Sequence, residues 1–147
     1  MIVRKVAVLG AGVMGAQIAA HLVNSNVPVI LFDLPAKEGD PDGIVKKGIA
    51  GLAKLEPAPL GTRDRAAHIG VANYATGLAR LAECDLVIEA IAERLDWKRD
   101  LYAKIVPHLA PHAILATNTS GLSLEALSEV LPAAIRPRFC GVHFFNP

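Results

Sequence analysis

The sequence has few aromatic residues and almost no net charge, and each of these features argues against a class of protein. Aromatic residues make up 5% of the 147 residues, although 52% are hydrophobic. A core of Ala, Val, Ile and Leu favours helices packed closely on a parallel sheet over a sandwich filled with large rings. The formal net charge is +1, which indicates neither a nucleic-acid surface nor one for an anionic membrane.

Cysteine is also scarce. Cys84 and Cys140 both lie among apolar residues, and their spacing is not that of metal ligands. We therefore predict two reduced core residues in a cytoplasmic compartment and no metal site, with a disulfide as the alternative.

The first residues superficially resemble a signal peptide or a membrane span, because Met1 to Lys5 precede an apolar run. The run contains three glycines, Gln17 and His21, and it changes from β-branched to Ala-rich composition. A strand followed by a helix fits this change better, so we expect neither secretion nor membrane insertion.

The segment Gly10–Gly15 matches G-x-G-x-x-G, a pattern that is weak alone and depends on its flanks. The residues before it predict a buried strand over Val3–Leu9, and those after it a helix over Val13–Asn24. A second strand, Val29–Phe32, ends at Asp33. This is the βαβ context that a dinucleotide-binding loop requires.

Each position of the loop has its own role in that interpretation. Gly10 allows the tight turn, Gly12 lets the backbone approach a pyrophosphate, and Gly15 lets the helix pack closely. Val13 and Met14 open the helix, whose free N–H groups and dipole favour phosphate. The alternative is a tight strand-to-helix turn that binds nothing.

Asp33 lies 18 residues after Gly15, close to the offset of an acid that binds the adenosine ribose. Its carboxylate would accept hydrogen bonds from the ribose hydroxyls and repel the 2′-phosphate of NADP, so we predict that the cofactor is NAD. Lys37 keeps NADP open, and the first βαβ unit alone does not exclude FAD.

Strands and helices alternate through the rest of the chain, which predicts an α/β fold of the Rossmann type. We expect a doubly wound, mostly parallel sheet with helices on both faces, forming one NAD-binding domain over residues 1–147. The further strands are predicted at Ile69–Tyr74, Leu86–Ala92, Ala113–Asn118 and Arg138–His143, and the helices at Gly43–Leu55, Leu95–Leu109 and Ser123–Leu131, with Ser123 as N-cap.

Three polar residues fall at the carboxyl ends of the last two strands, where open α/β sheets bind ligands. His143 can take a hydroxyl proton near neutral pH, and Asn118 and Ser120 can hold an alcohol or carbonyl oxygen. A histidine beside two phenylalanines could instead be structural.

Four segments together, "VAVLGAGVMGAQIAAHL", "LVIEAIAERLDWKRDLY", "ATNTSGLSLEAL" and "FCGVHFFNP", resemble a known family. The chain is similar over nearly its whole length to the NAD-binding domain of the 3-hydroxyacyl-CoA dehydrogenases of fatty-acid β-oxidation. The Pro-rich "EPAPLG" resembles the long, multidomain members.

The resemblance implies oxidation of (3S)-hydroxyacyl-CoA to 3-ketoacyl-CoA by hydride transfer to NAD. His143 would be the general base, and Ser120 and Asn146 would hold the reacting oxygen.

It also implies that Asp33, Glu93, Lys98 and Asn118 contact NAD. A solvated helix start is the alternative for Glu93 and Lys98, and a capped turn for Asn118. The acyl-CoA would meet the helix after the second strand, where Lys46, Lys47 and Lys54 are candidates for its phosphates; a solvated helix face is the alternative.

The chain departs from the family pattern in three ways. The glutamate that follows the catalytic histidine by about a dozen residues and the C-terminal helical domain are absent, and Gly121 replaces a common second serine. We therefore expect this chain to bind NAD with negligible turnover, and the full-length protein to be a homo-oligomer or multidomain.

Two other functions stay open. One is a dehydrogenase of β-hydroxy acids that are not CoA thioesters. The other is a non-catalytic dinucleotide-binding module.

Overall fold

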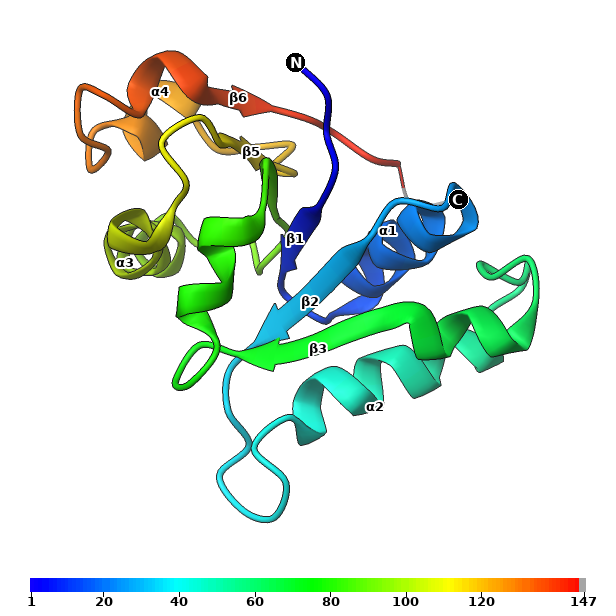
Figure 1. Cartoon of the computed structure of the whole chain (residues 1–147). Coiled ribbons are helices and arrows are strands. Elements are labelled where there is room, and N and C mark those ends of the chain that lie inside the picture. Colours follow the sequence, from blue (N-terminus) through cyan, green and yellow to red (C-terminus); the bar gives the residue numbers. More distant parts are fainter. Residues whose placement is uncertain (146–147) are drawn as a thin grey trace.

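Six strands form one sheet, which the computed structural model describes over residues 1–145. All five pairings are parallel, and the order is β3-β2-β1-β4-β5-β6 (Figure 1). The strands are β1 (Val6–Leu9), β2 (Val29–Asp33), β3 (Ile69–Asn73), β4 (Leu86–Glu89), β5 (Ile114–Thr117) and β6 (Phe139–Gly141). This is the strand order of the Rossmann fold, so the predicted fold class is confirmed.

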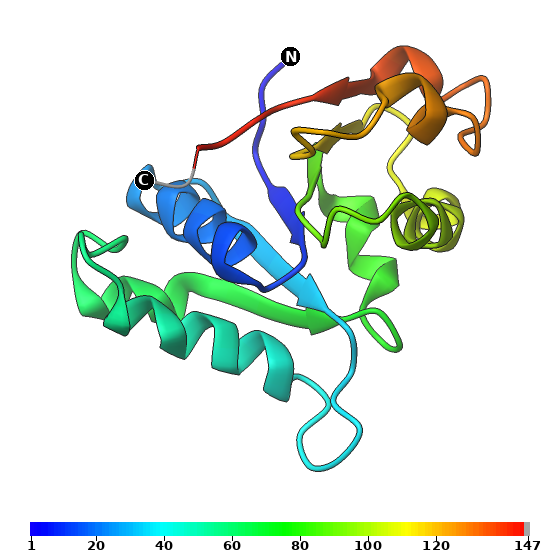
Figure 2. The same cartoon turned by 180° about the vertical axis from the view of Figure 1, so that it is seen from behind.

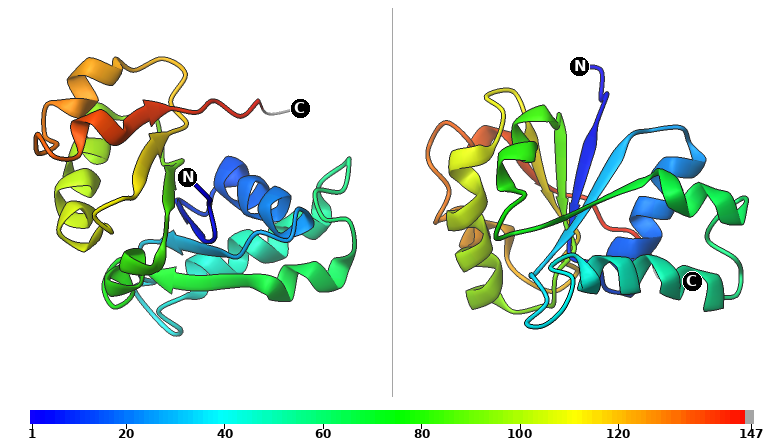
Figure 3. Two further views of the ribbon diagram at one scale, coloured as in Figure 1. Left: turned by 45° about the horizontal axis from the view of Figure 1, so that its top comes forward. Right: turned by 60° about the horizontal axis from the view of Figure 1, so that its bottom comes forward.

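Helices cover both faces of the sheet. α1 (Val13–Asn24) and α2 (Gly43–Gly51) lie on one side, and α3 (Leu95–Ile105) and α4 (Leu124–Ser128) on the other (Figures 1 and 2). Figure 3 shows the twist of the sheet between these two layers. Short 3₁₀ helices complete the connections at Leu52–Lys54, Arg63–His68, Leu78–Glu83, Val106–His108 and Arg136–Arg138.

The core divides into two clusters, one on each face. β1 is completely buried because its side chains alternate between the two clusters: Val6 and Val8 join α1 and α2, whereas Ala7 and Leu9 face α3. The sheet-facing side of α1 is rich in alanine, so the helix packs close to the strands. The aromatic-poor composition thus serves tight helix-on-sheet packing.

Several elements are shorter than the sequence predicts. β1 begins at Val6, since the N–H groups of Arg4 and Lys5 donate to the Asp85 carboxylate instead of joining a ladder. β4 ends at Glu89, whose own carboxylate accepts the N–H of Ile91 and turns the chain.

Helix ends also differ from the prediction. α3 stops at Ile105 and continues as a 3₁₀ turn, because Pro107 has no N–H for the helical ladder. α2 likewise stops at Gly51. The predicted N-cap is confirmed: the Ser123 hydroxyl accepts the N–H of Ala126 at 3.2 Å.

The two cysteines are free, so the disulfide alternative is wrong. Cys84 is a core residue as predicted, and burial raises the pKa of its thiol to about 11. The prediction for Cys140 is wrong: it is exposed. It lies on the edge strand β6, and its side chain alternates with that of Phe139, which packs on the α3 side.

None of the helices in residues 1–145 is long and apolar enough to cross a membrane.

Candidate functional site

The glycine loop joins β1 to α1, and backbone packing requires two of its glycines. Gly10 has φ +104°, and a Cβ on it would lie 2.8 Å from the carbonyl oxygen of Ala90. A Cβ on Gly15 would lie 1.7 Å from the carbonyl oxygen of Gly10. Gly15 therefore lets α1 approach the loop itself, more than the sheet.

Gly12 has a different environment. No atom lies within 4 Å of the position that its Cβ would take, and its φ of −70° is open to any residue. It is the N-cap of α1 and supplies no side chain to the first turn. The N–H groups at the start of α1, around Val13 and Met14, are thus free for an anionic ligand and lie at the positive end of the helix dipole.

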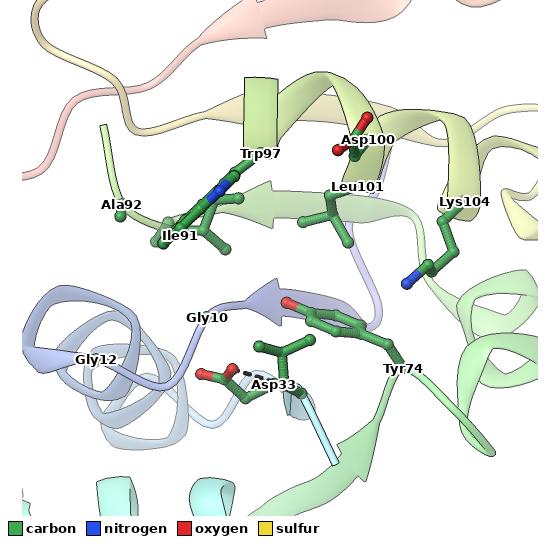
Figure 4. Close-up of a pocket in the computed structure, with 12 residues that line it drawn as sticks. Gly10, Gly12, Asp33, Tyr74, Ile91, Ala92, Trp97, Asp100, Leu101 and Lys104 are labelled. Carbon is green, nitrogen blue, oxygen red and sulfur yellow. Dashed lines mark hydrogen bonds between the residues drawn. The ribbon is translucent and has the colours of Figure 1, made fainter. Parts of the chain in front are cut away.

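A pocket of about 480 Å³ opens beside this loop, and we call it the Asp33 pocket. Gly10 and Gly12 line one side, Trp97 and Leu101 of α3 the other, and Asp33 lies at the end of β2 (Figure 4). The Asp33 carboxylate accepts the N–H of Ala11 and of Leu34, each at 2.7 Å. These two bonds fix its orientation and leave lone pairs for ligand hydroxyls.

A second pocket of about 260 Å³ lies on the other side of the loop after β4, and we call it the His143 pocket. Met14, Asn118, Ser120 and His143 all line it. The structure therefore brings together residues predicted from opposite ends of the sequence.

Asn118 holds this pocket together. Its side-chain oxygen accepts the N–H of Phe144 at 2.8 Å, which ties the segment after β6 to the end of β5. The side-chain NH₂ keeps both donors for a ligand. His143 and Ser120 are exposed, and the His143 ring meets the Phe145 ring edge-on with centroids 4.7 Å apart.

The wall between the two pockets is the segment Ala90–Ala92, which lines both. It follows Glu89, a completely buried carboxylate. Glu89 accepts hydrogen bonds from Lys98 at 2.6 Å, Tyr102 at 2.7 Å and Thr117 at 2.8 Å. Since these donors come from α3 and β5, the wall is fixed to both neighbours.

Lys98 is 1% exposed, so the alternative of a solvated helix start is wrong for it. Its ammonium lies against Glu89, the carbonyl of Ile91 and, at 3.5 Å, Glu93. The helical spacing of Lys98 with the buried Leu101, Tyr102 and Ile105 could have revealed this from the sequence.

Glu93 lines the His143 pocket. Partial burial opposes its charge, but hydrogen bonds from Thr119 at 2.7 Å and from the N–H of Gly121, with the nearby Lys98, keep its pKa below the usual range. The carboxylate joins the loops after β4 and β5.

The three candidate CoA lysines are exposed on α2 and the turn that follows it. Lys46 is engaged by Asp40, whose hydrogen bond raises the pKa of the lysine. Lys47 lines a groove between α1 and α2, beside Gly12 and Val13.

Asn146 lies outside the described residues. Sequence reasoning assigned no role to Tyr74 and Trp97, which line the Asp33 pocket, or to Glu89, which supports the wall. A lone carboxylate in the apolar run "LVIEAIA" was the available signal for Glu89.

Comparison with known proteins identifies the family of the chain. The sequence model of the family described as "3-hydroxyacyl-CoA dehydrogenase, NAD binding domain" matches residues 5–147. The chain belongs to this family. The predicted resemblance is thereby confirmed, and so is the α/β architecture on which it depends.

The relatives that the chain matches are longer than the chain itself. A putative fatty acid oxidation complex trifunctional enzyme of Rickettsia felis is 47% identical over 99% of the chain and 20% of its own length. A probable 3-hydroxyacyl-CoA dehydrogenase of Deinococcus radiodurans is 42% identical over 100% of the chain and 43% of its own length. The chain thus spans between a fifth and a half of the length of such relatives.

A solved structure supports the same assignment. The 3-hydroxybutyryl-CoA dehydrogenase of Escherichia coli K12 superposes with a TM-score of 0.78 at 32% identity, over 100% of this chain and 30% of that one.

Proposed function

We propose that this chain is the NAD-binding domain of an enzyme that oxidises (3S)-hydroxyacyl-CoA to 3-ketoacyl-CoA in β-oxidation. The observation that carries the proposal is the His143 pocket, where His143, Ser120 and Asn118 meet Met14 of the glycine loop. Family membership and the names of the relatives support the substrate class.

The site suits NAD because its two pockets share one wall beside the start of α1. The free N–H groups around Val13 and Met14 bind the diphosphate, and Asp33 accepts the adenosine ribose hydroxyls while disfavouring NADP. Glu93 and the side-chain amide of Asn118, which line the His143 pocket, would hold the nicotinamide half, and Lys98 would keep Glu93 in place.

NAD supplies the hydride acceptor when it is bound. His143 takes the proton of the substrate 3-hydroxyl, and Ser120 donates a hydrogen bond to the same oxygen as it becomes a carbonyl. The family resemblance implies that Asn146 also holds this oxygen. Lys47 and Lys54 are the more available partners for CoA phosphates, since Lys46 is paired with Asp40. We place the complete protein in the cytoplasm, as a multidomain protein or homo-oligomer.

The decisive experiment is His143→Ala in the complete protein, assayed by NADH oxidation with acetoacetyl-CoA. Loss of the general base lowers kcat by about a hundredfold or more, with the Kd for NADH unchanged. His21→Ala is the matched control, because His21 is an exposed histidine at the far end of α1; its turnover equals wild type. Full turnover in His143→Ala contradicts the role of His143.

Two further outcomes separate the remaining functions. Oxidation of free 3-hydroxybutyrate as fast as its CoA thioester would favour a dehydrogenase of non-CoA hydroxy acids. NADH binding without reduction of either ketone would favour a non-catalytic module.

A further inference from the structure

Tyr74 follows β3 directly and is 6% exposed. Within residues 1–145, its hydroxyl is the one buried side-chain polar atom without a hydrogen-bond partner. Buried hydroxyls nearly always have a hydrogen-bond partner, because a buried hydroxyl without one loses its hydrogen bonds to water and gains none in return. An unpaired hydroxyl in a native fold therefore calls for a partner that the protein itself does not supply.

The position of the ring identifies where that partner lies. Tyr74 lines the Asp33 pocket, and Figure 4 shows its ring between Asp33 and Leu101, with the hydroxyl directed towards Gly10. The ring is stacked on Phe32 with centroids 6.2 Å apart and planes 11° apart. Phe32 thus supports the ring, and the buried hydroxyl lies beside the glycine loop.

The surroundings also fix its role as a donor. Burial, reinforced by the charges of Asp33 and Glu89 and only partly offset by the nearby backbone of Gly10, raises the pKa of Tyr74 well above the usual range, so the hydroxyl keeps its proton. Asp33 beside it can only accept hydrogen bonds. The pocket therefore offers one donor and one acceptor side by side to a ligand that carries both kinds of group.

We propose that Tyr74 binds the cofactor by donating a hydrogen bond to the adenosine half of NAD, at an oxygen of the ribose or a ring nitrogen of adenine. The inference rests on the proposed function, since it needs NAD in the Asp33 pocket. Asp33 accepts hydrogen bonds from the ribose hydroxyls, and Tyr74 donates a hydrogen bond to an adjacent acceptor atom. The two side chains thus offer adenosine one acceptor and one donor. The hydroxyl is unpaired in the free protein because the ligand is its partner.

The test is Tyr74→Phe, which keeps the ring and its stacking on Phe32. Calorimetric titration is done with NADH and with 5′-AMP, which carries the adenosine half alone. We expect the Kd to rise about tenfold for both ligands, equivalent to about 1.4 kcal/mol. In the free protein, removing an unpaired buried hydroxyl raises the urea midpoint of unfolding.

Tyr102→Phe is the matched control for stability. Tyr102 is a buried tyrosine too, but its hydroxyl donates a hydrogen bond to Glu89 at 2.7 Å. This variant therefore lowers the urea midpoint, opposite in sign to Tyr74→Phe. If Tyr74 only stabilised the fold, Tyr74→Phe would lower the urea midpoint as Tyr102→Phe does.

Several outcomes overturn the inference. Unchanged affinity of Tyr74→Phe for 5′-AMP means that water, not adenosine, meets the hydroxyl, and a lowered midpoint means that it has a protein partner. If wild type binds NADH and the variant binds it equally well, only the role of Tyr74 fails. If wild type binds neither ligand, the proposed NAD site fails as well.

Discussion

The substitution Gly12→Ala separates ligand binding from folding at the glycine loop. No atom lies within 4 Å of the new Cβ, and φ −70°, ψ −171° is an ordinary conformation for alanine. Alanine restricts the unfolded chain, which stabilises the fold by about 0.4–1 kcal/mol. It is a poorer N-cap than glycine, which costs a similar amount. The free energy of unfolding therefore stays within about 0.5 kcal/mol of wild type.

Binding responds differently, because the methyl group occupies the open space through which a diphosphate reaches the first turn of α1. We expect the Kd for NADH to rise at least about tenfold. The assay is quenching of Trp97, the single tryptophan of the chain, which lines the Asp33 pocket. Urea unfolding of the same samples measures stability.

Gly15→Ala is the matched control, since it adds the same methyl group three residues later. Its Cβ would lie 1.7 Å from the carbonyl oxygen of Gly10, so the loop or α1 must move. We expect a loss of at least about 3 kcal/mol in the free energy of unfolding. NADH affinity equal to wild type in Gly12→Ala, or full stability in Gly15→Ala, would refute this account of the loop.

Two further predictions concern charged groups. Lys98→Met leaves the buried Glu89 carboxylate without its cation and lowers the free energy of unfolding, measured by urea titration, by about 3–5 kcal/mol. Adding Glu89→Gln restores part of the lost stability. A Lys98→Met variant as stable as wild type would contradict the energetic role given to the buried ion pair. The hydrogen bond from His112, with the N–H of Arg4, holds the pKa of Asp85 below its ordinary value of 3.8. The ionised Asp85 carboxylate therefore stabilises the fold above about pH 3.8. We expect wild type to be more stable than Asp85→Asn at pH 6, and this difference to shrink as the pH falls below about 3.8 towards 2.5. A difference in stability that does not change with pH would contradict the prediction.

The sequence predicted the parts of the site that local pattern determines. α1 has the predicted bounds, because the glycines before it and the turn after it mark both ends. Asp33 lies where a strand pattern ends. The sequence also predicted that Asn118 and His143 lie close together, because parallel strands bring their carboxyl ends to one edge of the sheet, and both line the His143 pocket.

The rest depends on contacts between distant elements. Tyr74 reads as the last apolar residue of a strand, and only the packed structure shows that its hydroxyl lacks a partner. Cys140 reads as a core residue, but β6 is an edge strand, and α1 and α2 pack against other strands. Sequence periodicity gives the alternation of a strand's faces and does not say which face is covered.

Glu89 links the two halves of the candidate site. It lies in the middle of the sheet, where β4 neighbours β1, and the chain on either side of this junction winds in opposite directions. The wall that follows it is common to both pockets, since Ala90–Ala92 line each of them, and a shift there would change the shape of both at once. A buried carboxylate that accepts one hydrogen bond from its own loop and three from α3 and β5 fixes this wall to its neighbours. An apolar residue at position 89 could fill the same space, but it could not accept the N–H of Ile91 or pair with Lys98, and the direction in which the loop leaves the sheet would no longer be fixed.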